Sequence, residues 1–579
     1  MLLLLPFTLF WGRAASASPP QQAGVPVATF HANSRLVQVD VVVLDAAGHP
    51  VLGLKPSDFH VLEDGKPQQI AAFDAHLQKP AIDPPHPFHL PPNQYTNVPE
   101  EDSSAPLAVV LFDTLNTAAG DQVYARQQML EFLKSLPAGE RIALFALGTR
   151  LRMIQTFTGK SDVLIAASTR LLASPSAFVR TEAEQQRQED DLIYRERMVA
   201  PTTGGVLSGG VQLPNATSIA PLAVATQKLR DALTEQQQAA ISERVGTTLE
   251  ALAELSVMMR GFQGRKNLLW LSGGFPFGFG PNPFERSDLR NTGHFDAPVR
   301  QTEALLAAAQ VAVYPIDVGG VHTQGTDLSS TGEGTSGVDA QTGISRLNTA
   351  FARQLQQETD AHATMDDIAD QTGGKAFYGS NDVRDALQRG LVQGSSYYSL
   401  SYIPENTAWN GKFRRIQVKL LRGGYRLQYR RGYYAIPETE RTAQDSNVKL
   451  VAALRPDMPD STSLFIKALI LPPDAGHKSL RVTYLIDPQQ VTFSDMPNGR
   501  KHALVDLLAI VWDKNGKDVG HAADTIDATL DQAAYQNVLH SGLQASQEIA
   551  VQPGAYRVRI GAVDRASQQV GTIDAVLAQ

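Results

Sequence analysis

The chain has 579 residues, of which 43% are hydrophobic and 19% charged, so it can build sizeable cores over about three or four domains. Its 51 basic and 59 acidic residues give a formal net charge of −8, which offers no electrostatic reason to expect a nucleic-acid partner. Cysteine is absent, and this excludes disulfides, thiolate metal sites and cysteine nucleophiles.

The first residues are typical of a signal peptide. Residues 2–11 are strongly apolar, and Ala15-Ser16-Ala17 follows them as a small-residue cleavage pattern, so we expect residues 1–17 to be removed. No later stretch is long and apolar enough to predict a transmembrane span. The predicted location is therefore secreted, periplasmic or in the cell envelope.

Residues 27–78 have the pattern of a small antiparallel β unit. Its first strand alternates apolar and polar residues, and Asp64-Gly65 predicts a hairpin after the second. The β pattern returns at 395–436. Because each segment is too small to be stable alone, we expect 27–78 and 395–436 to pack together as one β-sandwich. Residues 79–106 are rich in proline and acidic residues, and they are expected to be a linker.

Between residues 107 and 393, strands alternate with helices, which favours right-handed crossovers and a parallel sheet. Continuously apolar runs predict buried strands at 107–113, 141–147, 267–271 and 311–317. The expected fold class is α/β, with a doubly wound, mostly parallel sheet flanked by antiparallel β-sandwich domains. Three inserts interrupt the pattern, at 174–221, 275–297 and 319–345. Further strands predict a C-terminal β-sandwich over 447–579.

The end of the first buried strand carries Asp113, at the edge where α/β sheets bind ligands. Asn116 and Thr117 follow it and add oxygen atoms, so this loop outlines half of a cation site. In an alternative interpretation, Asp113 and Thr117 only cap the next helix, because Asp and Thr oxygens accept bonds from its first N–H groups.

Several short motifs of the chain resemble, in their order and spacing, those of bacterial von Willebrand factor A-related proteins. The motifs are Gln38–Val43, Asp58-Phe59, Glu63–Gly65, Phe112–Thr117, Gly264–Pro276, Tyr314–Asp317, Phe413–Ile416 and Arg431–Ala435. The resemblance covers roughly residues 30–436 and implies a von Willebrand A-type α/β domain. Domains of this kind bind Mg²⁺ through three loops and then bind a partner's carboxylate through the open metal position.

Relative to that family, the metal site is degenerate. Leu115 replaces the first serine of the Asp-x-Ser-x-Ser loop, and Gly273 stands where the third-loop aspartate is expected. Thr247 or Thr248 is the candidate for the second loop. Mg²⁺ needs near-octahedral oxygen geometry, so these losses impair the site. The predicted ligands of Mg²⁺ or another divalent cation are Asp113, Asn116, Thr117, Thr247, Ser272 and Asp317.

Aromatic rings follow the third buried strand directly. Phe275, Phe277 and Phe279 are separated by Gly and Pro, and they form either an exposed contact patch or a local core. The predicted partner-binding residues are Asp113, Thr117, Phe277 and Phe279. Basic residues also alternate with aromatic ones over 413–434, which favours a strand with one buried face over a nucleic-acid surface.

We therefore expect an exported, non-enzymatic protein–protein interaction or adhesion module that uses the carboxyl-terminal rim of the sheet. The sequence has no Gly-rich phosphate loop, His-Glu-x-x-His motif or Gly-x-Ser-x-Gly motif. Two alternatives stay open: a metal-dependent enzyme at the same rim, and a structural scaffold of the envelope. The sequence names neither the protein partner nor the oligomeric state.

Overall fold

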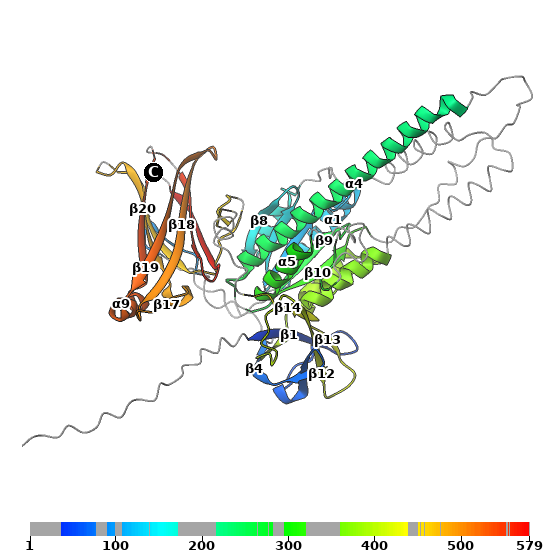
Figure 1. The fold of residues 1–579 in the computed structure, drawn as a ribbon, viewed down its shortest axis with the longest axis horizontal. Helices are drawn as coiled ribbons and strands as arrows, with labels where there is room; N and C mark the ends of the chain where they lie inside the picture. The colour runs from blue at the N-terminus through cyan, green and yellow to red at the C-terminus, as the bar shows by residue number, and fades with distance from the viewer. Residues whose placement is uncertain are drawn as a thin grey trace, which may run out of the picture.

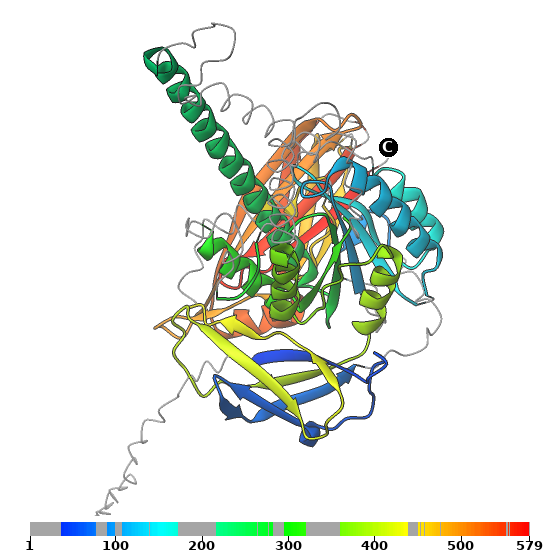
Figure 2. The same ribbon diagram turned by 90° about the vertical axis from the view of Figure 1, so that its right-hand side faces the viewer.

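The computed structural model describes residues 36–76, 90–98, 107–171, 216–281, 295–319, 359–437 and 450–577. Within these ranges, positions 138, 263, 276, 452, 457, 475, 552, 553 and 555 are not described. Figure 1 shows two β-sandwiches and a central sheet covered by helices, with the long helix α4 extending away from the body. Figure 2 shows the same arrangement after a quarter turn.

The N-terminal β-sandwich combines strands from both ends of the first 436 residues. One sheet has the order β13-β1-β11-β4 and the other β14-β12-β2-β3, and every pairing is antiparallel. The strands of the first sheet are β1 (Val37–Leu44), β4 (Ile70–His76), β11 (Tyr397–Tyr402) and β13 (Arg426–Gln428). Those of the second are β2 (Phe59–Glu63), β3 (Lys66–Gln68), β12 (Phe413–Leu420) and β14 (Gly432–Tyr434). The short helix η1 (Pro56–Asp58) precedes β2.

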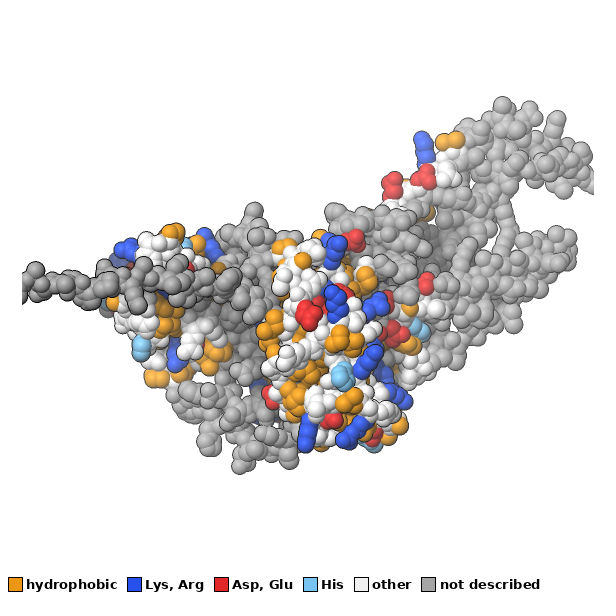
Figure 3. Space-filling model, turned by 60° about the horizontal axis from the view of Figure 1, so that its bottom comes forward, with side chains coloured by type: hydrophobic (Ala, Val, Ile, Leu, Met, Phe, Trp, Pro, Cys, Tyr) orange, Lys and Arg blue, Asp and Glu red, His pale blue; other side chains and the backbone are white. Residues whose placement is uncertain are grey.

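The two sheets pack around a shared apolar core, and a local turn and a buried ion pair join strands of the second sheet. Asp64 and Gly65 have φ angles of 48° and 81°, which suit the two central positions of a type I′ hairpin turn. Arg414 is only 2% exposed, and it pairs with Glu63 across the sheet at 3.3 Å. The ring of Trp409 lies against the guanidinium. The outer residues of β12 are exposed, and Figure 3 shows Lys and Arg side chains interspersed with hydrophobic ones on this side of the molecule.

The central sheet has the strand order β10-β9-β6-β7-β8. The first four strands are parallel and β8 is antiparallel to β7. The strands are β6 (Leu107–Asp113), β7 (Arg141–Leu147), β8 (Leu151–Thr158), β9 (Lys266–Ser272) and β10 (Val311–Asp317). Every residue of β6 and β9 is buried, as expected for strands covered on both faces.

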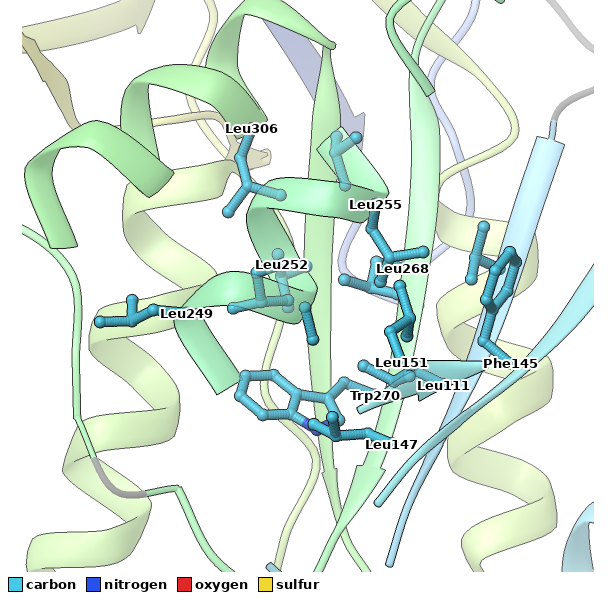
Figure 4. Packing of buried hydrophobic residues seen from close by; sticks show 14 of the residues in the cluster. Leu111, Phe145, Leu147, Leu151, Leu249, Leu252, Leu255, Leu268, Trp270 and Leu306 are labelled. Carbon is cyan, nitrogen blue, oxygen red and sulfur yellow. The ribbon is translucent and has the colours of Figure 1, made fainter. Parts of the chain in front are cut away.

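Helices cover both faces of this sheet. One face packs against α1 (Ala119–Lys134), α2 (Ser161–Ser168) and α7 (Val383–Gln393). The other face packs against α4 (Ala216–Met259), α5 (Asp296–Ala308) and a helix over residues 359–372. In Figure 4, Leu249, Leu252 and Leu255 of α4 lie beside Leu268 and Trp270 of β9.

The C-terminal β-sandwich packs two further antiparallel sheets around its own core. The first has the order β20-β16-β15-β5, and the second β17-β18-β21-β22 with β19 paired to β18. The first comprises β5 (Gln94–Thr96), β15 (Ile466–Leu471), β16 (Ser479–Ile486) and β20 (Leu543–Ala550). The second comprises β17 (Ser494–Asp495), β18 (Lys501–Asp513), β19 (Asp518–Leu530), β21 (Tyr556–Asp564) and β22 (Val570–Leu577). The short helix η4 (Pro488–Gln490) and α9 (Gln532–Ser541) complete it.

The expected fold class, a doubly wound and mostly parallel α/β sheet, is wrong. The described sheets are mostly antiparallel: four of the five have only antiparallel pairings, and parallel pairing of whole strands is confined to β10, β9, β6 and β7. The prediction gave most weight to the apolar strands between residues 107 and 393. Most of the described strands instead lie in the two sandwiches, whose pairings are all antiparallel and often join segments far apart in the chain.

Residues 94–97, which the sequence analysis assigns to a linker over 79–106, belong to the C-terminal sandwich. β5 pairs with β15, and the buried Asn97 side chain donates to the carbonyl oxygens of Ser461 and Leu464 at 2.7 and 2.8 Å. Its Oδ1 accepts from the N–H of Ile466 at 2.7 Å. This segment therefore forms the edge strand of a sheet whose other strands lie more than 360 residues later in the chain.

The predicted signal peptide over 1–17 lies outside the described residues, as do insert 319–345 after position 319 and insert 174–221 before position 216. Residues 216–221 are the first residues of α4, and residues 296–297 at the end of insert 275–297 begin α5. In the part of the chain that the structure describes, no helix is both long and apolar enough to span a membrane.

Candidate functional site

The side chains of Asp113, Trp270 and Ser272 meet where β6 and β9 end. Side chains alternate along a strand, so Asp113 faces the same side of the sheet as Val109 and Leu111, and Ser272 the same side as Trp270. This is the face covered by α4. The parallel pairing of β6 with β9 brings Asp113 next to Ser272 at one edge of the sheet.

The Asp113 carboxylate is enclosed by hydrogen-bond donors. Its Oδ2 accepts from Asn116 Nδ2 at 2.8 Å, Trp270 Nε1 at 3.0 Å and Ser272 Oγ at 2.9 Å. Its Oδ1 accepts from the backbone N–H of Asn116 at 2.9 Å. The residue is only 1% exposed. Burial raises the pKa of Asp113, although these hydrogen bonds lower it in part.

Helix α4 supplies the next layer of the site. Asn116 Nδ2 also donates to Thr248 Oγ1 at 3.1 Å, and Asn116 Oδ1 accepts from Arg244 Nε at 2.9 Å. Burial lowers the pKa of Arg244, and the negative charge of Asp113 opposes that shift. The hydroxyl that reaches the site from α4 is therefore that of Thr248, whereas the predicted Thr247 is only half-buried.

The capping alternative is wrong. Helix α1 begins at Ala119 after Ala118, whose side chain makes no capping bond. Asp113 instead closes a tight turn by accepting from the N–H of Asn116. Thr117 Oγ1 accepts from the N–H of Gly273 at 2.8 Å, so it joins the loop after β6 to the loop after β9.

Asp317 lies outside this network, although it is opposite Ser272 in the pairing of β10 with β9. Its Oδ1 accepts from the N–H of Gly319 at 2.9 Å, and its Oδ2 lies 3.7 Å from His362 Nε2. The structure thus brings together Asp113, Asn116, Thr117 and Ser272 of the predicted metal ligands, and it directs Asp317 to other partners.

The residues around Asp113 do not fit a divalent cation. Mg²⁺ requires six oxygen atoms in near-octahedral geometry. Three donors already occupy Asp113 Oδ2, and a Cβ at position 273 would lie 3.3 Å from Thr117 Cγ2, so a longer third-loop side chain has little space. In the described residues, no three His, Asp or Glu side chains are grouped so that they could hold a metal ion.

The four predicted partner-binding residues are all buried, which corrects that prediction. Asp113, Thr117, Phe277 and Phe279 are each at most 2% exposed, so none of them presents a surface to a partner. The rings of Phe277 and Phe279 lie 5.8 Å apart, and both belong to the core on the α4 side of the sheet. These rings therefore form the local core that the sequence analysis left open as an alternative.

An apolar groove does open to the surface nearby, between α4, α5 and the segment 453–461. Its volume is about 380 Å³. Its apolar wall is formed by Leu249, Ala253, Val257, Pro298, Leu305 and Met458. Glu250 and Glu254 lie beside this wall. Glu254 Oε2 forms a salt bridge with Arg455 Nη2 at 2.9 Å, while Glu250 is exposed.

Sequence reasoning missed three participants in these two sites: Trp270, Arg244 and the groove. A buried indole N–H usually finds an acceptor, so Trp270 in the middle of an apolar strand was a usable signal. Arg244 and the groove depend on which elements lie beside the apolar stripe of α4, and the stripe itself does not identify those neighbours.

No family model and no curated protein matches the chain. Among solved structures, a point mutant of the PilB minor pilin from Streptococcus sanguinis shares 12% identity at a TM-score of 0.22, covering 51% of this chain and 61% of that one. The SpaC pilus adhesin from Lactobacillus rhamnosus GG shares 10% identity at a TM-score of 0.23, over 84% and 54%. Proximal thread matrix protein 1 from the mussel byssus shares 10% identity at 0.20, over 52% and 48%. TM-scores of this size are too low to assign the chain any of these folds.

Proposed function

We propose that this chain is an exported, non-enzymatic protein-interaction module that binds a helical segment of a partner protein in the groove between α4, α5 and residues 453–461. The observation that carries the proposal is the groove itself, because the sheet rim around Asp113 is enclosed and the groove is accessible. Export is supported by the signal-peptide pattern of residues 1–17. The resemblance to von Willebrand factor A-related proteins stays a prediction.

The spacing of the groove residues favours a helical partner. Leu249, Ala253 and Val257 are four residues apart and form one stripe along α4. A stripe of this kind matches the apolar face of a second helix, whose anchor side chains also recur every three or four residues. A volume of about 380 Å³ is within the range of ligand pockets and accommodates a few large apolar side chains.

The charges beside the groove indicate the partner's polar face. Glu250 and Glu254 lie next to the apolar stripe, and Arg455 compensates only Glu254. Cationic side chains on the partner would meet the remaining negative charge, which favours the correct partner and speeds its association. The proposed partner is therefore an amphipathic helix whose apolar face is flanked by Lys or Arg.

A labelled peptide tests the proposal by fluorescence anisotropy. The probe is an amphipathic peptide of about 14 residues, near the length at which isolated helices begin to form, with Leu on one face and Lys beside it. A second peptide has Glu in place of each Lys. We expect the Lys peptide to bind and the Glu peptide to bind at least tenfold more weakly.

Two variants locate the binding surface. Ala253→Trp fills the groove and should weaken the Lys peptide at least tenfold. Val123→Trp adds the same side chain at a 60% exposed position on α1, across the sheet, and should leave affinity unchanged. Failure of both peptides to bind, or equal affinity for wild type and Ala253→Trp, would refute the proposed function.

A further inference from the structure

The Asp113 site has a positive charge from the protein itself. Arg244 donates through Nε to Asn116 Oδ1 at 2.9 Å, and Asn116 donates to Asp113 Oδ2 at 2.8 Å. A Cβ built on Gly274 would lie 3.4 Å from Arg244 Nη2, so the guanidinium lies close to the loop after β9 as well. Arg244 thus lies between the two loops that would supply a metal's oxygen ligands.

We infer that the guanidinium of Arg244 is the permanent counter-cation of the Asp113 site and stands in place of an exchangeable divalent cation. This inference goes beyond the proposed function, because it concerns how the rim is closed and not what the groove binds.

The donor set is consistent with this inference. A buried carboxylate is costly unless it is paired or hydrogen-bonded, and Asp113 has both four donors and a nearby cation. Arginine keeps its proton in proteins and presents its N–H groups in a planar fork. A cation tethered to α4 cannot dissociate, so the charge balance of this site does not depend on the concentration of free ions.

The loop after β9 has glycines, Gly273 and Gly274, where the guanidinium of Arg244 approaches it. Gly274 would place a Cβ 3.3 Å from the carbonyl oxygen of Asn116 and 3.4 Å from Arg244 Nη2. Gly273 adds no second carboxylate, so the enclosed groups contain one negative and one positive charge. An aspartate at that position would leave the single guanidinium with two carboxylates.

Two measurements test the inference. Electron paramagnetic resonance of Mn²⁺ is recorded with wild type and with Asp113→Asn. We expect the amplitude of the free Mn²⁺ signal to be the same with both proteins. A loss of free Mn²⁺ with wild type that disappears in Asp113→Asn would overturn the inference, and this measurement needs no Arg244 variant to fold.

The second measurement is a thermal double-mutant cycle of Arg244→Met, Asp113→Asn and the double variant. Arg244→Met alone leaves a buried charge uncompensated and should lower the midpoint by about 5–10 °C. In the Asp113→Asn background, Arg244→Met should lower the midpoint by less than half as much. If Arg244→Met alone does not fold but the double variant does, that result also supports the pairing. Additive shifts would overturn it. Lys134→Met, in the exposed Lys134–Glu131 pair, is the control and should shift the midpoint by about 2 °C or less.

Discussion

Glu303 of α5 is a buried carboxyl group that should control part of the pH dependence of stability. The residue is 3% exposed, and its Oε2 accepts from the N–H of Gly280 at 3.0 Å. Its Oε1 has no hydrogen-bond partner in the described part of the chain. Burial raises the pKa of Glu303 to about 7 from an ordinary value of 4.5, and the Gly280 bond and the charge of Arg430 offset this only in part.

The direction and size of the effect follow from that pKa. Between about pH 4.5 and 7 the folded protein holds this proton more tightly than the unfolded chain, so the free energy of unfolding falls as the pH rises. A pKa raised from 4.5 to about 7 corresponds to a change of about 3 kcal/mol in the free energy of unfolding, because a shift of one pKa unit corresponds to about 1.4 kcal/mol. Glu303→Gln keeps an acceptor for Gly280 and removes the charge. We expect it to raise the free energy of unfolding by up to about 3 kcal/mol at pH 8 and to change it little at pH 4.

Urea denaturation of wild type and Glu303→Gln from pH 4 to 8 measures this difference. Burial also lowers the pKa of Lys266 to about 7, but both proteins share that group, so it cancels in the comparison. Glu131→Gln, on the exposed side of α1, is the matched control and should give a small change. A Glu303→Gln effect of equal size at pH 4 and pH 8 would refute the reasoning.

Three further changes test other buried polar groups by urea denaturation. Ser272→Ala removes a donor to Asp113 and should cost about 2 kcal/mol, and a cost that persists unchanged in an Asp113→Asn background would contradict this role. Asn97→Ala should cost about 3 kcal/mol, because the buried carbonyl oxygen of Leu464 and the N–H of Ile466 lose their partner while Ser461 keeps its bond from Thr572, and a loss below about 0.5 kcal/mol would contradict this role of Asn97. Glu63→Gln should cost about 3–5 kcal/mol by leaving Arg414 without its counter-ion. The double variant Glu63→Gln/Arg414→Met should recover part of this loss, and no recovery would contradict a role for the pair.

The continuously apolar strands were the parts of the fold most accessible from sequence. Strands β6, β7 and β10 have the bounds predicted for them, because a run buried on both faces has no polar residue inside it. Strand β8 was missed, since its Arg and Gln residues alternate with apolar ones beside a half-exposed edge. Strand β5 was missed because it is only three residues long and pairs with a strand far along the chain.

The candidate site was predictable only to the extent that strand ends determine it. Asp113 and Ser272 meet because neighbouring parallel strands end at the same edge of a sheet. Thr247 and Thr248 were both candidates for the hydroxyl from α4, and the predicted ligand set took Thr247. Thr248 makes the contact, and one residue corresponds to a turn of about 100° around a helix. Arg244 is four residues before Thr248 and shares its face, and it was missed because its partner, Asn116, lies more than 100 residues earlier in the chain.

Helix α4 connects the enclosed site and the accessible groove. Arg244 and Thr248 face the loop after β6, and Leu249 begins the stripe that lines the groove. Because the charge that holds this face of α4 against Asp113 belongs to the helix itself, the helix needs no ion to adopt this position. A groove that is formed in advance avoids the ordering cost that a partner would otherwise have to offset on binding. Affinity for the partner should therefore depend on the shape of the groove and on Glu250, and the divalent-ion concentration should have no influence on it.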